Sequence, residues 1–182
     1  MELFLVRHGE TAWNAAGRFC GRSDPPLTRR GREQARALRA VVGEEVFDRF
    51  VSSPSLRALE TARLAYGEPS VDERLLEIDF GDLEGSTWIE CSDDVRRRLL
   101  DYEGFEAPGG ESVSAMGNRV LAALNDLGPG KHLVVTHGGV IRFLTGRASV
   151  TDYPKVATIS RLRATLRTGA SGAVEAACEL VR

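Results

Sequence analysis

The stretch FLVRHGET, residues 4–11, decides the fold of this chain. The residues Leu3–Val6 are all apolar, and they lead directly into Arg7 and His8. A short continuous apolar run is typical of a strand that is buried on both faces. Arg7 and His8 add little to stability at the end of such a strand. Their position therefore points to a site that binds an anion and does chemistry on it.

Two further segments have the same character. Arg49–Ser52 and His132–Thr136 are short and contain valine or leucine, and each is followed by a helical pattern. This alternation predicts an α/β fold with three layers, α/β/α, around a mostly parallel central sheet. The length of 182 residues predicts a single domain over residues 1–182.

Several predicted helices have recognisable N-terminal capping residues. Thr28 is a suitable N-cap for a helix through residue 42, although Gly31 in its first turn costs stability. Ser53 with the following proline forms a cap and first-turn pair, and Ser92 precedes two aspartates that suit the positive end of a helix dipole. Two more helices are expected within residues 112–128 and from Gly138 onward.

The sequence pattern changes near the end of the given sequence, from helical spacing to alternation. Residues 162–166 and 174–180 alternate between apolar and polar side chains, and TGASG at 168–172 separates them. This pattern predicts an antiparallel hairpin at the edge of the sheet. In mid-chain, EGFEAPGGES at 103–112 is the most loop-like segment, and we interpret it as a lid or rim loop over a site.

Composition excludes several classes of protein. A net charge of −2, with 42% hydrophobic and 27% charged residues, is ordinary for a soluble globular protein. Nothing in this balance favours a nucleic acid or an anionic membrane as partner. The three cysteines are too far apart for a disulfide framework or a metal site, which favours a cytoplasmic location. No apolar run approaches the ~18–20 residues of a membrane span.

The ends of the three predicted strands carry chemically useful residues. Arg7 and His8 follow the first strand, Arg57 lies in the helix after the second, and His137 and Gly138 follow the third. Ligands of open α/β sheets bind beyond the carboxyl ends of the strands, where helix N-termini attract anions. One histidine at a strand end is more often structural, and one arginine is usually solvated. Four such residues at three strand ends predict a phosphate pocket.

Six motifs occur in order between residue 2 and about residue 144: RHGETAWN, GRFCGRSDPPLTRRGREQA, SSPSLRALETA, LLEIDFGDLEG, PGGES and VVTHGGVIR. Together they resemble the histidine phosphatase superfamily, also called the phosphoglycerate mutase-like proteins. The pair RHG and HGG carries most of this specificity. The resemblance implies a phosphoglycerate mutase-like fold and phosphoryl transfer through a histidine.

The resemblance also implies roles for single residues. His8 is the expected nucleophile, because a neutral imidazole is available near its reference pKa of about 6.5. Arg7, Arg57 and His137 are expected to hold the phosphoryl oxygens. Glu77 matches the family's proton donor, which needs a raised pKa to stay protonated. From the residues alone, three acids of the same loop remain its rivals: Asp79, Asp82 and Glu84.

The remaining site residues concern the substrate. Asn14 resembles an additional donor to a phosphoryl oxygen, and Gly138 offers an unhindered backbone N–H. Specificity is expected to lie around the mouth of the pocket, in Cys20, Gly21, Arg22, Trp88 and residues 98–111. For Trp88, plain packing is an equally good interpretation.

These residues predict a metal-independent phosphatase of small phosphate monoesters that uses no cofactor. The chain has no HExxH, no clustered Cys and His, and no GxxxxGK[ST] loop. Its size and LLEIDFGDLEG resemble the α-ribazole phosphatase branch, which implies α-ribazole 5'-phosphate as a substrate. Two alternatives are a cofactor-dependent phosphoglycerate mutase and a catalytically silent module that binds phosphate or protein. The protein is expected to be a monomer or a homodimer.

Overall fold

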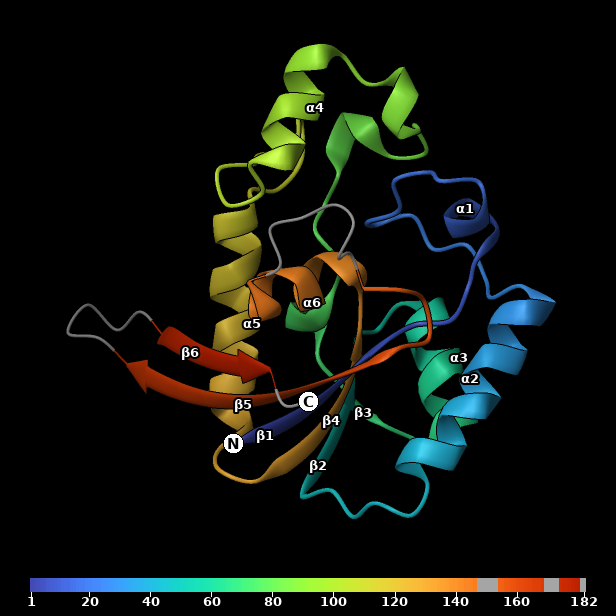
Figure 1. Ribbon diagram of the computed structural model, residues 1–182, viewed down its shortest axis with the longest axis vertical. Helices are drawn as coiled ribbons and strands as arrows, with labels where there is room; N and C mark the ends of the chain where they lie inside the picture. Colours follow the sequence, from blue (N-terminus) through green and yellow to red (C-terminus); the bar gives the residue numbers. More distant parts are fainter. Residues whose placement is uncertain (147–153, 169–173, 181–182) are drawn as a thin grey trace.

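Figure 1 shows a computed structural model, which describes residues 1–146, 154–168 and 174–180. These residues form a mixed sheet of six strands in the order β3-β2-β4-β1-β5-β6. The strands are β1 (Glu2–Arg7), β2 (Arg49–Ser52), β3 (Ser70–Val71), β4 (Lys131–Thr136), β5 (Ile159–Thr168) and β6 (Val174–Leu180). The first four run parallel, whereas β5 is antiparallel to β1 and β6 to β5. The predicted mostly parallel sheet and its C-terminal hairpin are confirmed, whereas the short β3 was not predicted; most of the turn TGASG lies outside the described residues.

Helices cover both faces of this sheet. The helices are α1 (Ala12–Ala15), α2 (Arg29–Val42), α3 (Leu56–Ala65), α4 (Asp93–Leu100), α5 (Val113–Leu127) and α6 (Gly138–Thr145). Three short 3-10 helices are η1 (Glu73–Leu75), η2 (Gly81–Leu83) and η3 (Trp88–Glu90). Figure 1 shows α2 and α3 on one face and α5 and α6 on the other, so the three-layer prediction is confirmed. No helix in the described ranges is both long and apolar enough to cross a membrane.

The apolar run of β1 is explained by its two buried faces. Leu3 and Leu5 belong to the core cluster on the α5 and α6 side, whereas Phe4 and Val6 belong to the cluster on the α2 and α3 side. Successive side chains of a strand point to opposite faces, so both faces of β1 must be apolar. None of these four residues is more than 1% exposed. The central position of β1 places its carboxyl end, with Arg7 and His8, in the middle of the molecule.

Helix α3 begins later than predicted. Its N-cap is Ser55 rather than Ser53, and the helix starts at Leu56. The hydroxyl of Ser53 instead contacts the His137 imidazole, at 2.7 Å from Nε2. The Ser55 side chain makes no capping hydrogen bond. The first N–H of the helix donates instead to the carboxylate of Asp24, at 2.6 Å, so a residue from a distant segment supplies the capping hydrogen bond. The other predicted starts, after Thr28 and Ser92 and at Gly138, are confirmed.

Gly31 brings α2 close to the loop that follows β1. A Cβ atom at this position would lie 2.2 Å from the carbonyl oxygen of Glu10, which is far inside contact distance. The same carbonyl accepts a hydrogen bond from the N–H of Thr28, at 2.9 Å. Gly31 therefore costs helix propensity but allows α2 to pack against the backbone two residues after His8.

The sequence predicts a lid or rim loop over residues 103–112, and the structure anchors this segment in the core at two residues. Phe105 is 1% exposed and Ala107 is 2% exposed, so the segment is anchored in the core. The N–H of Glu111 donates to the carbonyl of Asp79, at 2.9 Å, and the N–H of Asp82 donates to Pro108 O, at 2.8 Å. The backbone of this segment therefore braces the loop around residues 79–82, although five of its residues are exposed: Glu103, Gly104, Glu106, Gly109 and Gly110. The polar, glycine-rich sequence of this segment gives little indication that it packs against the core.

Candidate active site

A cavity of about 600 Å³ opens beside the carboxyl end of β1. Six residues predicted by name line it: Arg7, His8, Asn14, Cys20, Glu77 and Trp88; Leu99 and Tyr102 of the predicted segment 98–111 line it as well. Arg57 and His137 are 0% exposed and are not among its lining residues. They lie next to His8 in a polar cluster that the protein itself encloses. The structure thus brings the predicted residues together in two layers, one facing the cavity and one behind it.

His8 is a neutral imidazole with one nitrogen fixed. It follows β1 directly, and its N–H donates to Thr136 O in the adjacent β4, at 3.1 Å. Its Nδ1 lies 2.8 Å from the carbonyl oxygen of Gly9, so Nδ1 carries the proton and Nε2 keeps the lone pair. Burial, together with the charges of Arg57 and Arg7, holds the pKa of His8 well below its usual value of 6.5.

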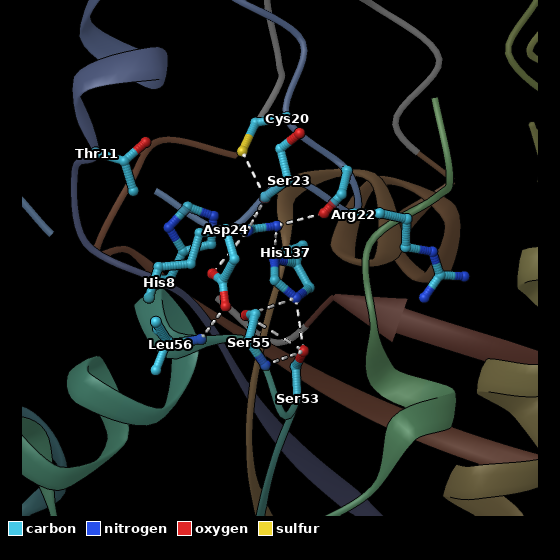
Figure 2. A network of polar contacts seen from close by, with 12 residues as sticks. His8, Thr11, Cys20, Arg22, Ser23, Asp24, Ser53, Ser55, Leu56 and His137 are labelled. Atoms are coloured by element: carbon cyan, nitrogen blue, oxygen red, sulfur yellow. Dashed lines mark hydrogen bonds and ion pairs between the residues drawn. The ribbon is translucent and has the colours of Figure 1, made fainter. Parts of the chain in front are cut away.

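His137 lies beside His8, with 5.2 Å between the ring centroids. It follows β4 and is held on both nitrogens. Arg57 donates from Nη2 to Nδ1, at 3.3 Å. Nε2 then donates to the Ser53 hydroxyl, at 2.7 Å, and Figure 2 shows this contact between His137 and Ser53. Burial and the nearby Arg57 and His8 hold the pKa of His137 well below 6.5. Ser53 was not predicted as a site residue; its place directly after the second strand was the available signal.

The guanidinium group of Arg57 is held by the segment 21–24. Nη1 donates to Ser23 O, at 2.7 Å, and to Asp24 Oδ1, at 3.1 Å, while Nη2 donates to Gly21 O, at 2.8 Å. The Nε atom is buried and has no hydrogen-bond partner among the residues that the structure describes. A buried N–H without an acceptor is costly, so this position suits an acceptor that a ligand brings.

Segment 154–158 lies along Arg7 and His8, and sequence reasoning missed it. Arg7 donates from Nη1 to Pro154 O, and its backbone N–H donates to Thr158 O, at 3.1 Å. The N–H of Ala157 lies 3.0 Å from the carbonyl oxygens of both Arg7 and His8. Ala157 has a φ of 51°, in the left-handed region that non-glycine residues rarely adopt. Backbone strain of this kind is often found at functional sites.

Glu77 faces the cavity from the loop between η1 and η2. It is 4% exposed. Its carboxylate oxygens accept from the N–H groups of Ile78, at 3.0 Å, and Gly139, at 2.9 Å. Burial raises the pKa of Glu77, and this effect outweighs the two N–H groups and the charges of Arg57 and Arg7, which oppose it. Glu77 therefore holds a proton to a higher pH than an ordinary glutamate.

Two of the three rival acids of this loop have structural partners instead. Asp79 accepts from the N–H of Gly81, at 2.9 Å. Glu84 accepts from the backbone N–H groups of Gly21, at 2.8 Å, and Arg22, at 2.9 Å. Asp79, Asp82 and Glu84 are all absent from the lining of the cavity. Geometry therefore separates Glu77 from the acids that the sequence left as alternatives.

The predicted glycines act through their backbone. Gly21 does not line the cavity; its carbonyl receives Arg57, and a Cβ there would lie 2.2 Å from Ile78 O. Gly138 is buried, and the neighbouring Gly139 lines the cavity and donates to Glu77. A Cβ on Gly139 would lie 2.4 Å from the Glu77 carboxylate. Close approach of the backbone, rather than a positive φ, explains why Gly21 and Gly139 are glycines.

Asn14 and Cys20 line the cavity with different chemistry. Asn14 accepts through Oδ1 from the N–H of Thr11, at 3.2 Å, within the capping box of α1. Cys20 donates its S–H to Ser23 O, at 3.3 Å, and burial raises the pKa of the thiol to about 11. Cys20 therefore contributes an uncharged thiol to the wall of the cavity. Trp88 also lines the cavity, whereas Arg22 is paired with Glu111 and Asp79 outside it.

The charged groups around His8 suit an anion. Within residues 1–146, 154–168 and 174–180, no group of three or more His, Cys, Asp and Glu side chains is arranged to hold a metal ion. Beside His8 lie the guanidinium groups of Arg7 and Arg57, whose charges both act on its imidazole. Guanidinium groups bind phosphate in a planar, bidentate manner. The arrangement therefore favours a phosphoryl group next to a neutral imidazole and a buried carboxyl group whose pKa is raised.

Several known proteins are similar to this chain in sequence and fold. Phosphoserine phosphatase 1 of Hydrogenobacter thermophilus is 36% identical over 135 residues, which are 70% of this chain and 64% of that protein, so the match spans slightly less than two thirds of that relative. The crystal structure of phosphoglycerate mutase from Thermus thermophilus is 40% identical, with a TM-score of 0.80 over 89% of this chain and 91% of that one. A structure from Escherichia coli, described as that of a candidate alpha-ribazole-5'-P phosphatase, is 28% identical, with a TM-score of 0.73 over 100% of this chain and 95% of that one.

The family description supports the motif-based prediction. The description of the histidine phosphatase superfamily (branch 1) matches residues 3–167. This range contains all six motifs quoted above and both layers of the polar cluster around His8. The chain belongs to branch 1 of the histidine phosphatase superfamily.

Proposed function

We propose that this protein hydrolyses phosphomonoesters through a phosphohistidine on His8, with Glu77 as general acid and base. One observation carries the proposal: the same cavity is lined by the His8 imidazole, whose Nδ1 is fixed by Gly9 O, and by the buried carboxyl group of Glu77. Burial lowers the pKa of His8 and raises that of Glu77. Two titratable groups whose pKa values are pushed in these directions are suited to act as a nucleophile and a general acid.

In the first half-reaction, the lone pair on His8 Nε2 attacks phosphorus. The hydrogen bond from Nδ1 to Gly9 O fixes the tautomer that leaves Nε2 available. The ester P–O bond breaks as the N–P bond forms. The leaving alkoxide takes the proton of Glu77 and departs as an alcohol, so that Glu77 becomes a carboxylate.

In the second half-reaction, water replaces the alcohol in the cavity. The Glu77 carboxylate takes a proton from this water as its oxygen attacks phosphorus. The N–P bond breaks, and its electron pair returns to His8. Inorganic phosphate leaves, and both groups regain their starting protonation states.

Two guanidinium groups and the second histidine hold the phosphoryl oxygens in this proposal. Arg7 lines the cavity directly. The buried Nε of Arg57 offers a donor to a phosphoryl oxygen. A dianion beside His137 favours its protonation; Nδ1 can then donate to a phosphoryl oxygen only as Arg57 Nη2, which donates to Nδ1 at 3.3 Å in this structure, turns to the phosphate. Charge stabilisation by such fixed donors is usually the largest contribution to phosphoryl transfer.

The substrate class follows the family. The relatives and structures described above are named for phosphoserine, phosphoglycerate and alpha-ribazole 5'-phosphate chemistry. We assign hydrolysis of small phosphorylated metabolites, with α-ribazole 5'-phosphate among the candidates. Phosphoglycerate mutation is the second candidate, because a structure named for that activity is 40% identical. A mutase must return the phosphoryl group to a second hydroxyl before water reaches it.

The test is release of phosphate from p-nitrophenyl phosphate with a metal chelator present. Activity is expected to persist with the chelator, to disappear in His8→Ala and to remain weakly in Glu77→Gln. Asp82→Asn is the matched control, because Asp82 belongs to the same loop but lies outside the cavity. Wild-type activity in His8→Ala would overturn the mechanism. No activity and no phosphoenzyme in the wild type would favour the silent module.

A second assay separates hydrolysis from mutation. The enzyme is incubated with 3-phosphoglycerate, and free phosphate and the isomerised product are followed together. Release of phosphate without isomerisation supports the phosphatase assignment. Rapid isomerisation with little free phosphate would assign the protein as a mutase.

A further inference from the structure

The cavity is much larger than a phosphoryl group. Its volume of about 600 Å³ is in the range of sites that enclose whole drug-sized ligands, roughly 300–1,000 Å³. His8, Arg7 and Glu77 occupy one part of its lining. The remainder is available to the alcohol part of a substrate. The side chains there therefore select the leaving group.

Much of this remaining wall is aromatic or aliphatic. Phe19, Phe80, Trp88, Leu99 and Tyr102 all line the cavity. The rings of Phe19 and Phe80 pack against each other with 5.1 Å between centroids. Trp88 remains 37% exposed, although most large apolar side chains of the chain are buried. An aromatic side chain left open inside a concave site is a surface that a ligand can cover.

This wall is preformed by two segments that are distant in sequence. The N–H of Phe19 donates to Ser86 O, at 2.8 Å, and the N–H of Gly85 donates to Phe19 O, at 2.9 Å. Thr87 forms an isolated bridge with Arg18 and a capping box with Glu90 around Trp88. The backbone on either side of Phe19 and Trp88 is therefore fixed before a ligand arrives. A preorganised wall reduces the ordering cost of binding.

We propose that Trp88 and Phe19 form a leaving-group subsite for a flat, apolar ring. The substrate class is then a phosphomonoester of a ring-bearing alcohol, such as an arylalkyl or nucleoside-type alcohol, rather than the phosphate of a small hydroxy or amino acid. This inference rests on the proposed function of the same cavity. The competing possibility is a second anionic group on the substrate, because Lys155, Arg18 and Arg30 also line the cavity.

The test compares 2-phenylethyl phosphate with ethyl phosphate. The two alcohols have similar leaving-group chemistry and differ by the ring, so the ratio of their kcat/KM values reports the subsite. We expect the phenylethyl ester to be preferred by roughly 10- to 100-fold, the usual contribution of one ring stacked on an aromatic side chain. Trp88→Ala is expected to remove most of this preference and bring the ratio of the two kcat/KM values close to one.

Ile89→Ala is the matched control. Ile89 is adjacent to Trp88 in η3 but is 81% exposed and does not line the cavity, so the ratio should not change. A ratio near one in the wild type would overturn the subsite. So would a preference for phosphoserine over both esters that Lys155→Met abolishes, because that result assigns a second anionic group.

Binding separates this inference from the proposed function. Calorimetry with 2-phenylethylphosphonate and ethylphosphonate, which cannot be hydrolysed, gives the same ratio without turnover. Tighter binding of the phenylethyl compound that depends on Trp88 supports the subsite even if His8 is never phosphorylated. Equal binding of the two compounds contradicts the subsite even if p-nitrophenyl phosphate is hydrolysed normally.

Discussion

Arg119 holds the loop that carries Glu77, and its replacement should impair acid catalysis. Its guanidinium group makes five hydrogen bonds in the structure. Two go to Glu111, at 2.7 and 2.8 Å, and three go to the backbone carbonyls of Arg74, Leu76 and Glu77, at 2.7, 2.7 and 3.0 Å. Arg119→Met removes all five donors and leaves the Glu111 carboxylate without its main partner.

The expected loss of stability follows from these contacts. Each hydrogen bond contributes about 1 kcal/mol net, and water can reach part of this group because the Arg119 side chain is 18% exposed. A loss of about 3 kcal/mol is therefore expected, which lowers Tm by roughly 6–12 °C in a chain of this size. Arg63→Met is the matched control. Arg63 makes a similar bidentate pair with Glu68, but both side chains are mostly exposed, so Tm should hardly change.

The effect on catalysis has a distinct signature. A displacement of Glu77 by about 1 Å is expected to lower kcat/KM roughly 100-fold. The loss should be larger for an alkyl phosphate than for p-nitrophenyl phosphate, whose leaving group needs no proton. Vanadate binding should persist, because Arg119 contacts neither His8 nor Arg57. A folded Arg119→Met enzyme with wild-type kcat/KM for both esters would refute the reasoning.

Three further predictions concern pH and packing. Because burial raises the pKa of Glu77, kcat/KM should fall as pH rises through that pKa, and Glu77→Gln should remove this alkaline limb from a pH–rate profile. His8 has a folded pKa below its unfolded value of about 6.5, so its contribution to stability is present above pH 6.5 and is lost as pH falls toward the folded pKa. Urea titrations between pH 5 and 7 should therefore show that the free energy of unfolding rises less steeply with pH in His8→Asn than in the wild type, by up to about 1.4 kcal/mol per pH unit. The same slope in both proteins would contradict a neutral His8. Gly31→Ala should lower Tm, although alanine normally stabilises a helix by about 1 kcal/mol, because the new methyl group would lie 2.2 Å from Glu10 O; a higher Tm would show that the backbone yields easily.

Local patterns were sufficient to predict five of the six strands, all except the two-residue β3, and the gathering of the functional residues at one edge of the sheet. The apolar run of β1 requires two buried faces, and parallel strands end at one edge of a sheet. His8, Arg57 and His137 therefore had to approach one another once three strands were recognised. Their separation into two layers was not predictable, because it depends on how residues 21–24 fold over Arg57.

Features that depend on long-range packing were missed. Residues 103–112 have a loop-like composition, and only the side chain of Phe105 hinted that the segment is anchored in the core. The contact of segment 154–158 with Arg7 and His8 has no local signal, because its hydrogen bonds join residues about 150 positions apart. Helix α3 begins late because Ser53 contacts His137, a tertiary interaction that overrides a good local cap.

The most direct measurement is the chemical identity of the phosphorylated enzyme. Wild-type and Glu77→Gln enzymes are mixed with substrate and quenched in alkali, which preserves a phosphorus–nitrogen bond, and the modified peptide is sequenced by mass spectrometry. We expect the phosphoryl group on His8, attached through Nε2 by ³¹P NMR, and a larger amount in Glu77→Gln because water attack is slowed. A phosphoryl group on His137 or any other residue, or continued turnover with no labelled His8, would contradict the account.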